Sequence, residues 1–236
     1  MMDGDRSDPF GDAGWRDEPS ASERGDVVVR ETHLSRKPNR GAGLVALGSL
    51  GVLTFMSVVY WTDAMGLGAA LPASRSLVYG DGEYWRLFTT MGAHADLEHL
   101  LSNGIVLTVL AFLLYGYFGS GVYPASCVAL GGLVTGLSIS SYPAETRLVG
   151  ASGLVYLMVA FWLTLYLLIE RTQALHKRIV RAVGFGLIVL MPASIEPTVS
   201  YRTHAIGFAV GIAYGLFYFS RHRETLRGAE RRETVF

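Results

Sequence analysis

The chain has 236 residues, of which 50% are hydrophobic and only 17% charged, and its mean hydropathy is +0.33. This composition is typical of a membrane protein. Because 20 basic and 20 acidic residues balance, the charge gives no indication of a nucleic acid or an acidic partner, and a single cysteine, Cys127, excludes an intramolecular disulfide.

The two ends of the chain are polar. Residues 1–40 are rich in Asp, Arg, Ser and Gly, contain few aliphatic residues apart from Val27–Val29, and lack the apolar core of a signal peptide. We expect residues 1–40 to form a disordered cytosolic tail. Residues 221–236 form a second, basic tail, which we also place in the cytosol.

Between the tails, the apolar segments predict an all-α, polytopic membrane protein with six spans over residues 41–220. A spanning helix needs ~20 mostly apolar residues. The connection over residues 62–93 is too polar to span, although its "YWRLF" could lie at the membrane interface through its aromatic rings. The fifth span is the shortest. The expected spans are 41–61, 98–118, 122–140, 151–169, 182–195 and 201–220.

The basic residues predict the orientation of these spans. Lys and Arg favour the cytosolic side of a membrane protein, and they are concentrated before the first span, between the fourth and fifth, and after the sixth. We therefore expect an integral protein of the plasma membrane with both termini in the cytosol. The basic residues on the cytosolic side would be Arg36, Lys37, Arg40, Arg171, Lys177, Arg178, Arg181, Arg221, Arg223, Arg227, Arg231 and Arg232, against Arg75, Arg86, Arg147 and Arg202 outside.

Polar residues inside spans are costly, and three groups lie toward the outer ends of their spans. The first is "HADLEHLLSN", in which His99 and Asn103 are four residues apart and share a helix face. His94 lies a turn and a half earlier. Two neutral donors on one face suit a site that stabilises a developing oxyanion. Hydrogen bonding between helices is the alternative interpretation.

The second group is "GASGLVY", at the start of the fourth span. Ser152 lies just inside the span, and Tyr156 follows one turn later on the same face. Gly150 and Gly153 allow close approach of the backbone. Small residues side by side are also common at contacts between membrane helices, so this group alone fits packing as well as chemistry.

The third group is "THAIGFAVGIAYG", in the last span. His204 is the only ionisable group in the interior of this span apart from tyrosines, with Arg202 at its outer end, and glycines follow it at 207, 211 and 215. The spacing puts the glycines in a ridge on the face that carries His204, so the imidazole should point into a close helix contact.

Taken together, the three groups predict a catalytic site. Ser152 and His204, on different helices at one depth, would form a nucleophile and a general base. His99 and Asn103 would supply donors to a tetrahedral intermediate. Since Glu145 and Glu196 lie in outer loops, we expect a Ser–His dyad without a carboxylate.

These motifs, with "WR" at Trp85-Arg86, resemble those of the rhomboid intramembrane serine proteases in order and spacing over residues 41–220. The resemblance implies a six-helix bundle with Ser152 as nucleophile and His204 as base, and Tyr156 packed beneath the imidazole. It also implies an oxyanion hole formed by His99, Asn103 and the Ser152 amide. His94 and Trp85-Arg86 would be structural, Gly150 would support the serine, the fifth span would act as a lateral gate, and no metal or cofactor is expected.

The resemblance implies a substrate class as well. The expected substrates are single-span membrane proteins cut near their outer boundary, because a helix must unwind before its amides can be attacked, and small residues ease this. Two alternatives remain: a catalytically silent rhomboid-like factor that binds membrane proteins or acts in their quality control, and a small transporter with a polar midplane site.

Overall fold

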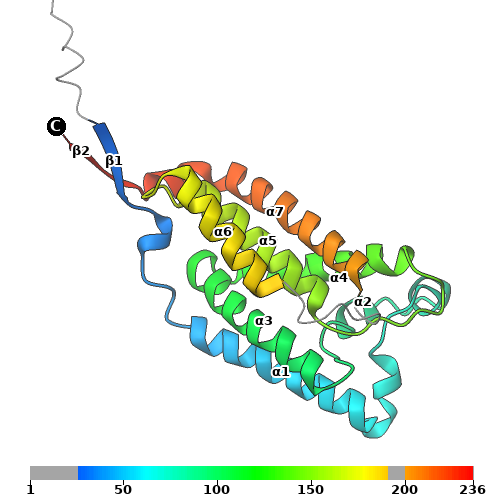
Figure 1. The fold of residues 1–236 in the computed structure, drawn as a ribbon. Helices are drawn as coiled ribbons and strands as arrows, with labels where there is room; N and C mark the ends of the chain where they lie inside the picture. Colours follow the sequence, from blue (N-terminus) through cyan, green and yellow to red (C-terminus); the bar gives the residue numbers. More distant parts are fainter. Residues whose placement is uncertain (1–25, 191–199, 236) are drawn as a thin grey trace, which may run out of the picture.

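A computed structural model describes residues 26–190 and 200–235, and Figure 1 shows a helical bundle with a small strand pair at one end. Short turns of 3₁₀ or π-helix lie in the connections, and Gly121–Ser126 leads directly into α4. The helices are α1 Ala42–Thr62, α2 Arg86–Thr89, α3 Leu97–Phe118, α4 Cys127–Ser140, α5 Ser152–Ile169, α6 Leu175–Leu190 and α7 Tyr201–Gly228, and the strands are β1 Asp26–Glu31 and β2 Arg231–Val235.

Within the described residues, five helices are long and apolar enough to cross a membrane: α1, α3, α4 with its preceding turn, α5 and α7. They agree with five of the six predicted spans to within a few residues at most ends. Local signals account for their boundaries. The side chain of Asp96 caps the start of α3 by accepting from the His99 amide at 2.8 Å, and α1 ends where Asp63 takes a left-handed conformation.

The predicted fifth span differs in the structure. Its helix, α6, begins at Leu175 and not at 182, so Lys177, Arg178 and Arg181 lie in its first turns and not in a loop. Its 16 residues extend about 24 Å, which is less than the ~30 Å hydrocarbon thickness of a bilayer. Residues 191–195 of the prediction lie outside the described residues. The count of six spans is therefore not confirmed.

The tails also differ from the prediction where the structure describes them. β1, in the tail expected to be disordered, pairs antiparallel with β2, and Arg30 donates to Glu233 at 2.7 Å across the pair. α7 continues to Gly228, beyond the predicted end of the last span. The run of valines in β1 favours an extended strand once a partner is present. The part of the chain that the structure describes is therefore helical with one added two-stranded sheet.

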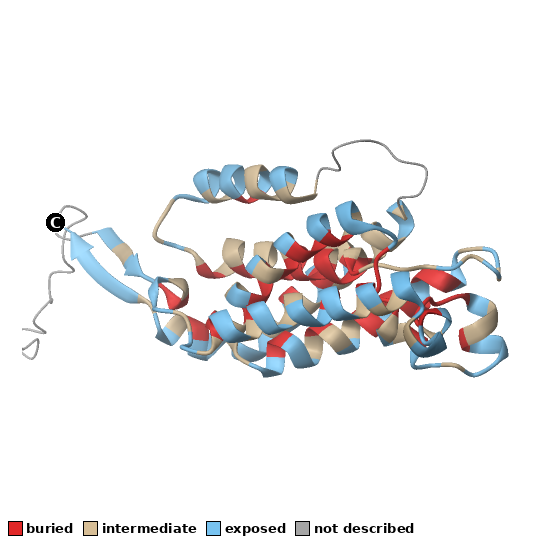
Figure 2. Ribbon diagram, turned by 90° about the horizontal axis from the view of Figure 1, so that it is seen from below, coloured by how far each residue is buried: buried red, intermediate tan, exposed pale blue. Residues whose placement is uncertain are grey.

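The centre of the bundle is α5. Leu157, Met158, Phe161 and Leu165 are among its fully buried side chains, and the buried residues in Figure 2 gather along this helix. α6, by contrast, has one buried residue, Ala182, and it shows mainly exposed and half-buried positions in the same view.

α7 runs parallel to α5 in direct backbone contact. A Cβ built on Gly207 would lie 2.3 Å from the Gly153 carbonyl oxygen, and one on Gly211 would lie 2.3 Å from that of Leu157. These distances leave no room for any side chain, so the glycine ridge is the surface on which the two helices meet. The contact sets the start of α5 beside the start of α7.

Candidate active site

Ser152 is the first residue of α5 and is half-buried, and a sharp turn of the backbone precedes it. Gly150 has φ of +117°, a conformation that residues with a Cβ rarely adopt. Its amide donates to the Thr90 carbonyl oxygen at 2.9 Å. A Cβ on Gly150 would lie 2.5 Å from Cε1 of His99, so the imidazole of His99 packs directly on this backbone. Gly150 is therefore required both for the turn and for the approach of His99.

His94 holds the same turn from the other side. Its Nε2 accepts a hydrogen bond from the Ala151 amide at 3.3 Å, while its Nδ1 lies 3.3 Å from the Gly92 carbonyl oxygen and 3.1 Å from the Ser57 hydroxyl. This arrangement requires a neutral imidazole with its proton on Nδ1. Burial, together with the neighbouring His99, lowers the pKa of His94 to about 4. His94 thus connects α1 to the residue before Ser152.

The imidazole of His204 lies against Tyr156. The two ring centroids are 4.0 Å apart and the rings are 10° from parallel. The Tyr156 hydroxyl donates to the Leu190 carbonyl oxygen, at the end of α6, at 2.7 Å. Tyr156 therefore contacts both α7 and α6 from its position one turn after Ser152.

The starts of α5 and α7 meet through small side chains. A Cβ on Gly153 would lie 2.8 Å from Cγ2 of Thr203, the residue before His204. Ser152 and His204 are thus brought to neighbouring positions on two helices in contact. Among the described residues, no hydrogen bond joins the Ser152 hydroxyl to the His204 imidazole.

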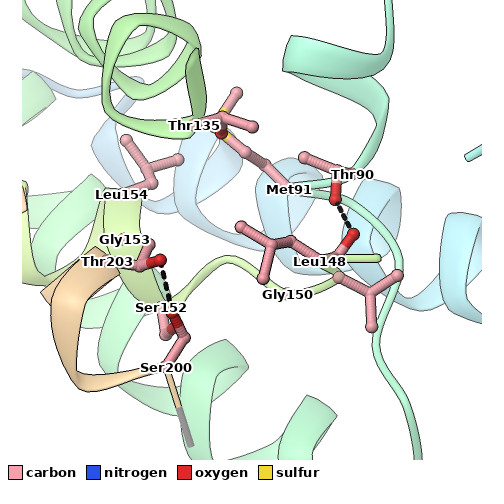
Figure 3. Close-up of a pocket in the computed structure, with 11 residues that line it drawn as sticks. Thr90, Met91, Thr135, Leu148, Gly150, Ser152, Gly153, Leu154, Ser200 and Thr203 are labelled. Carbon is pink, nitrogen blue, oxygen red and sulfur yellow. Dashed lines mark hydrogen bonds between the residues drawn. The ribbon is translucent and has the colours of Figure 1, made fainter. Parts of the chain in front are cut away.

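A small cavity of about 30 Å³ lies beside Ser152 (Figure 3). Its walls come from α4, α5, α7 and the loops before α3 and α5, and they are partly polar. Among the described residues, the Ser200 and Thr203 hydroxyls are hydrogen-bonded to each other within its wall, and the Thr90 hydroxyl donates to the Leu148 carbonyl oxygen at 2.5 Å. Residues that line the cavity include Thr90, Met91, Thr135, Leu154, Ser200 and Thr203.

Comparison with known proteins assigns this arrangement to a family. The profile of the Rhomboid domain matches residues 81–221, which include every site residue named above except Ser57. The chain belongs to the rhomboid family. The resemblance read from its motifs is thereby confirmed, and the five apolar helices fit an integral membrane protein.

Three relatives illustrate how similar this rhomboid chain is to known proteins. An uncharacterised protein of Mycobacterium tuberculosis is 30% identical over 198 residues, covering 78% of this chain and 81% of its own length. RHOMBOID-like protein 5 of Arabidopsis thaliana is 27% identical over 78% of this chain and 61% of its own. YdcA of Bacillus subtilis, named as a candidate rhomboid protease, is 26% identical over 66% of this chain and 74% of its own.

The two α3 residues predicted to line the site, His99 and Asn103, differ in what they contact. His99 reaches the turn at Gly150, and its ring centroid lies 5.0 Å from that of His94. Asn103 is buried, and its amide nitrogen donates to the His99 carbonyl oxygen of its own helix at 3.1 Å. One of its two amide hydrogens is used there, and the other makes no hydrogen bond within the described residues.

The "WR" pair of this rhomboid chain organises the long loop before α3. Arg86 is buried, and its Nη1 donates to the carbonyl oxygens of Ala69 and Pro72, both at 2.9 Å, while its Nε is paired with Glu83. Trp85 is about half exposed, as expected for a ring at a membrane interface. Within the described residues, Arg86 forms its hydrogen bonds to the loop and none to Ser152, so the pair shapes the loop that supplies Thr90.

The sequence analysis named Ser152, Gly150 and Gly153 but missed the other residues that line the cavity, as well as the bond from Tyr156 to α6. Thr90 and Thr203 are ordinary polar residues beside the motifs, and no spacing pattern distinguishes them. Their closeness to motif residues, Thr203 before His204 above all, was the only available signal.

Proposed function

We propose that this rhomboid chain is an intramembrane serine endopeptidase that acts through a Ser152–His204 dyad. The observation that carries the proposal is the stacking of His204 on Tyr156, one turn from Ser152. A ring held face to face by an aromatic partner has few orientations available, so its nitrogens are positioned before a substrate arrives. The small cavity beside the same serine supports the proposal further.

In the proposed reaction, Ser152 Oγ attacks the carbonyl carbon of the scissile peptide while His204 takes its proton. The resulting oxyanion would accept hydrogen bonds from the Ser152 amide, His99 and the second amide hydrogen of Asn103. The C–N bond breaks as His204 returns the proton to the leaving amine. Water then attacks the acyl-enzyme with His204 as base, which releases the acid and restores Ser152. The missing Ser152–His204 hydrogen bond would form when substrate fills the site, as catalytic bonds often do.

We propose a membrane topology of six crossings with both termini in the cytosol. Because α5 and α7 run parallel in contact, the chain between them must return across the bundle. α6 is antiparallel to α5: Arg178 donates to Leu167 near one end and Tyr156 to Leu190 at the other. The pairing of β1 with β2 keeps both tails at one end, which agrees with an even number of crossings and with the clustering of basic residues.

The proposed substrates are single-span membrane proteins with a small side chain at the bond that is cut. A cavity of about 30 Å³ has room for only one or two water molecules, since about 10–15 Å³ of such space is needed for one. It would accept the side chain of alanine or serine, and a leucine or phenylalanine would clash with Thr135 or Leu154. The plasma membrane is the proposed location.

The proposal is tested by cleavage of a single-span model substrate in liposomes by the full chain. Ser152→Ala and His204→Ala should each abolish cleavage. Matched controls are Ser220→Ala and His222→Ala: both residues are exposed on α7, and His222 stacks on Tyr218 as His204 stacks on Tyr156. Both controls should cleave like the wild type. Cleavage that persists in Ser152→Ala would disprove the dyad. Wild-type protein that binds substrate without cutting it would favour a silent rhomboid-like binding factor.

The topology is tested separately by labelling single introduced cysteines with a membrane-impermeant maleimide. The native Cys127 is completely buried, so it should not react. Cysteines placed at Val27 and Val235 should be labelled from the same side of the membrane, and one placed at Glu145 only from the opposite side. Labelling of Val27 and Val235 from different sides would exclude an even number of crossings.

A further inference from the structure

A second hollow, separate from the cavity at Ser152, lies between α5, α6 and α7. It is a groove of about 440 Å³, lined among others by Leu163, Leu167, Val183, Leu187, Phe208 and Ile212. Among the residues that line it, Thr164 has the only polar side chain, and its hydroxyl donates to the Ala160 carbonyl oxygen of its own helix at 2.8 Å. The wall therefore offers no free side-chain hydrogen-bonding group, and its chemistry suits hydrocarbon.

One end of this groove carries a positive charge. Arg178 lies one turn before Ala182 on the same face of α6, and Ala182 lines the groove. The Nη1 of Arg178 donates at 2.6 Å to the carbonyl oxygen of Leu167, another lining residue. The guanidinium is thus fixed at the end of the groove where α5 finishes and α6 begins.

The guanidinium of Arg178 is incompletely satisfied. Within the described residues, its buried Nε has no hydrogen-bond partner and no carboxylate pairs with Arg178. A buried, unpaired N–H of a charged group is costly. Lys177 and Arg181 are exposed beside it, so an anion would meet an excess of positive charge at this end. Arg171, in the preceding loop, is already paired with Glu230 at 3.4 Å.

We propose that this groove binds an anionic phospholipid, with one acyl chain lying between α5, α6 and α7 and the phosphate bound by Arg178. Arginine matches the phosphate geometry, and basic sites between membrane helices recognise anionic headgroups. By the topology proposed above, the lipid belongs to the cytosolic leaflet. The proposal concerns binding alone and does not depend on protease activity.

The charge at the end of the groove favours a lipid over a substrate helix. A membrane-spanning helix rarely carries an anionic group inside the bilayer, whereas a phospholipid carries its phosphate directly at the end of its acyl chains. A flexible acyl chain also suits the apolar walls of the groove, and it would separate α6 from the paired helices α5 and α7 along the middle of their length.

The test is native mass spectrometry of the purified full chain with dioleoyl phosphatidylglycerol and, as the neutral counterpart, dioleoyl phosphatidylcholine. We expect the wild type to bind the anionic lipid about tenfold more tightly than the neutral one. Arg178→Gln should remove that preference. Arg75→Gln, which loses the same charge at an exposed position in the loop before α2, away from the groove, should keep it. Equal affinity for the two lipids in the wild type would overturn the proposal, as would an unchanged preference in Arg178→Gln.

A second variant tests the site of the acyl chain. A Cβ on Gly186 would lie 3.4 Å from Cδ1 of Leu163, an ordinary contact, so Gly186→Leu is tolerated at the backbone while its outer atoms enter the groove. This variant should bind both lipids several-fold more weakly. Gly51→Leu, at an exposed position of α1 with nothing within 4 Å of its Cβ, should bind like the wild type. Unchanged lipid binding by Gly186→Leu would place the lipid outside the groove and overturn the proposal. Displacement of the bound phosphatidylglycerol by soluble glycerol phosphate would also overturn it, because the headgroup would then bind without an acyl chain in the groove.

Discussion

Tyr156 joins the proposed general base to the neighbouring helix α6: its ring lies parallel to that of His204 at 4.0 Å, and its hydroxyl donates to the Leu190 carbonyl oxygen at 2.7 Å. The two contacts have different consequences. The ring restricts the imidazole, while the hydroxyl ties α6 to the bundle at the end near the site. Any movement of α6 that breaks this bond would leave the ring contact in place.

Substitutions at Tyr156 separate these two contacts. Tyr156→Phe keeps the stacked ring and should retain cleavage within about fivefold, since a single hydrogen bond contributes roughly 1 kcal/mol or less. Tyr156→Ala frees the imidazole and should lower kcat by about tenfold or more. The measurement is cleavage of a single-span substrate at saturating concentration. If Tyr156→Phe were as slow as Tyr156→Ala, the bond to Leu190 and not the stacking would be the important contact.

The helix contact at Gly207 predicts a large effect from one methyl group. Gly207→Ala would place a Cβ 2.3 Å from the Gly153 carbonyl oxygen and force α7 away from α5. We expect a loss of about 1–3 kcal/mol in the free energy of unfolding, with cleavage reduced because Ser152 and His204 separate. Unfolding in mixed micelles on SDS titration measures the first effect.

The matched control for that change is Gly51→Ala. Gly51 lies in a helix, as Gly207 does, but a Cβ there meets nothing within 4 Å. It should be neutral or slightly stabilising, because alanine favours the helix over glycine. Equal destabilisation by the two substitutions would mean that helix packing is not the cause.

His94 predicts a loss of stability in acid. Its pKa is about 4 in the folded chain, below the ordinary value of 6.5, so the unfolded chain takes up the proton more readily. The stabilisation is complete above pH 6.5 and is lost as pH falls from 6.5 toward 4, by an amount of order 3 kcal/mol. The main cause is the burial of the imidazole, which disfavours its charged form, and a protonated ring could not accept from the Ala151 amide either.

The variant His94→Gln isolates this effect. Glutamine can accept from Ala151 without titrating, so the unfolding free energy of the variant should change less between pH 7 and pH 4.5 than that of the wild type. His176→Gln, at an exposed position on α6, should follow the wild-type profile. A variant at position 94 with the full wild-type pH dependence would assign the acid sensitivity to other groups.

The cavity beside Ser152 predicts selectivity for side-chain size. Substrates with alanine at the cleaved bond should have kcat/KM about tenfold or more above those with leucine, since a cavity of about 30 Å³ cannot take a branched chain without displacing its walls. Thr135→Ala enlarges the cavity and should reduce the difference. Cleavage rates of a matched substrate series measure this, and equal rates for alanine and leucine would show that the cavity does not receive the side chain.

Much of the fold can be read from local sequence. Runs of apolar residues identified α1, α3, α4, α5 and α7 because bilayer thickness demands a minimum length from every spanning helix. The start of α6 was predicted too late, at residue 182, because its first turns carry Lys177, Arg178 and Arg181 and composition alone excluded them from an apolar span. The pairing of β1 with β2 was also missed, since it joins segments some two hundred residues apart and three valines give no information about a partner.

The site, like the fold, could be predicted only where it depends on local sequence. The spacing of Ser152, Tyr156 and the glycines after His204 was enough to put them on shared helix faces, because helical periodicity is a local property of the chain. Which atoms then meet depends on how separate helices pack. That His94 accepts from Ala151, that His99 lies on Gly150, and that Thr203 faces Gly153 all follow from contacts between elements distant in sequence, and only the folded bundle brings them within reach.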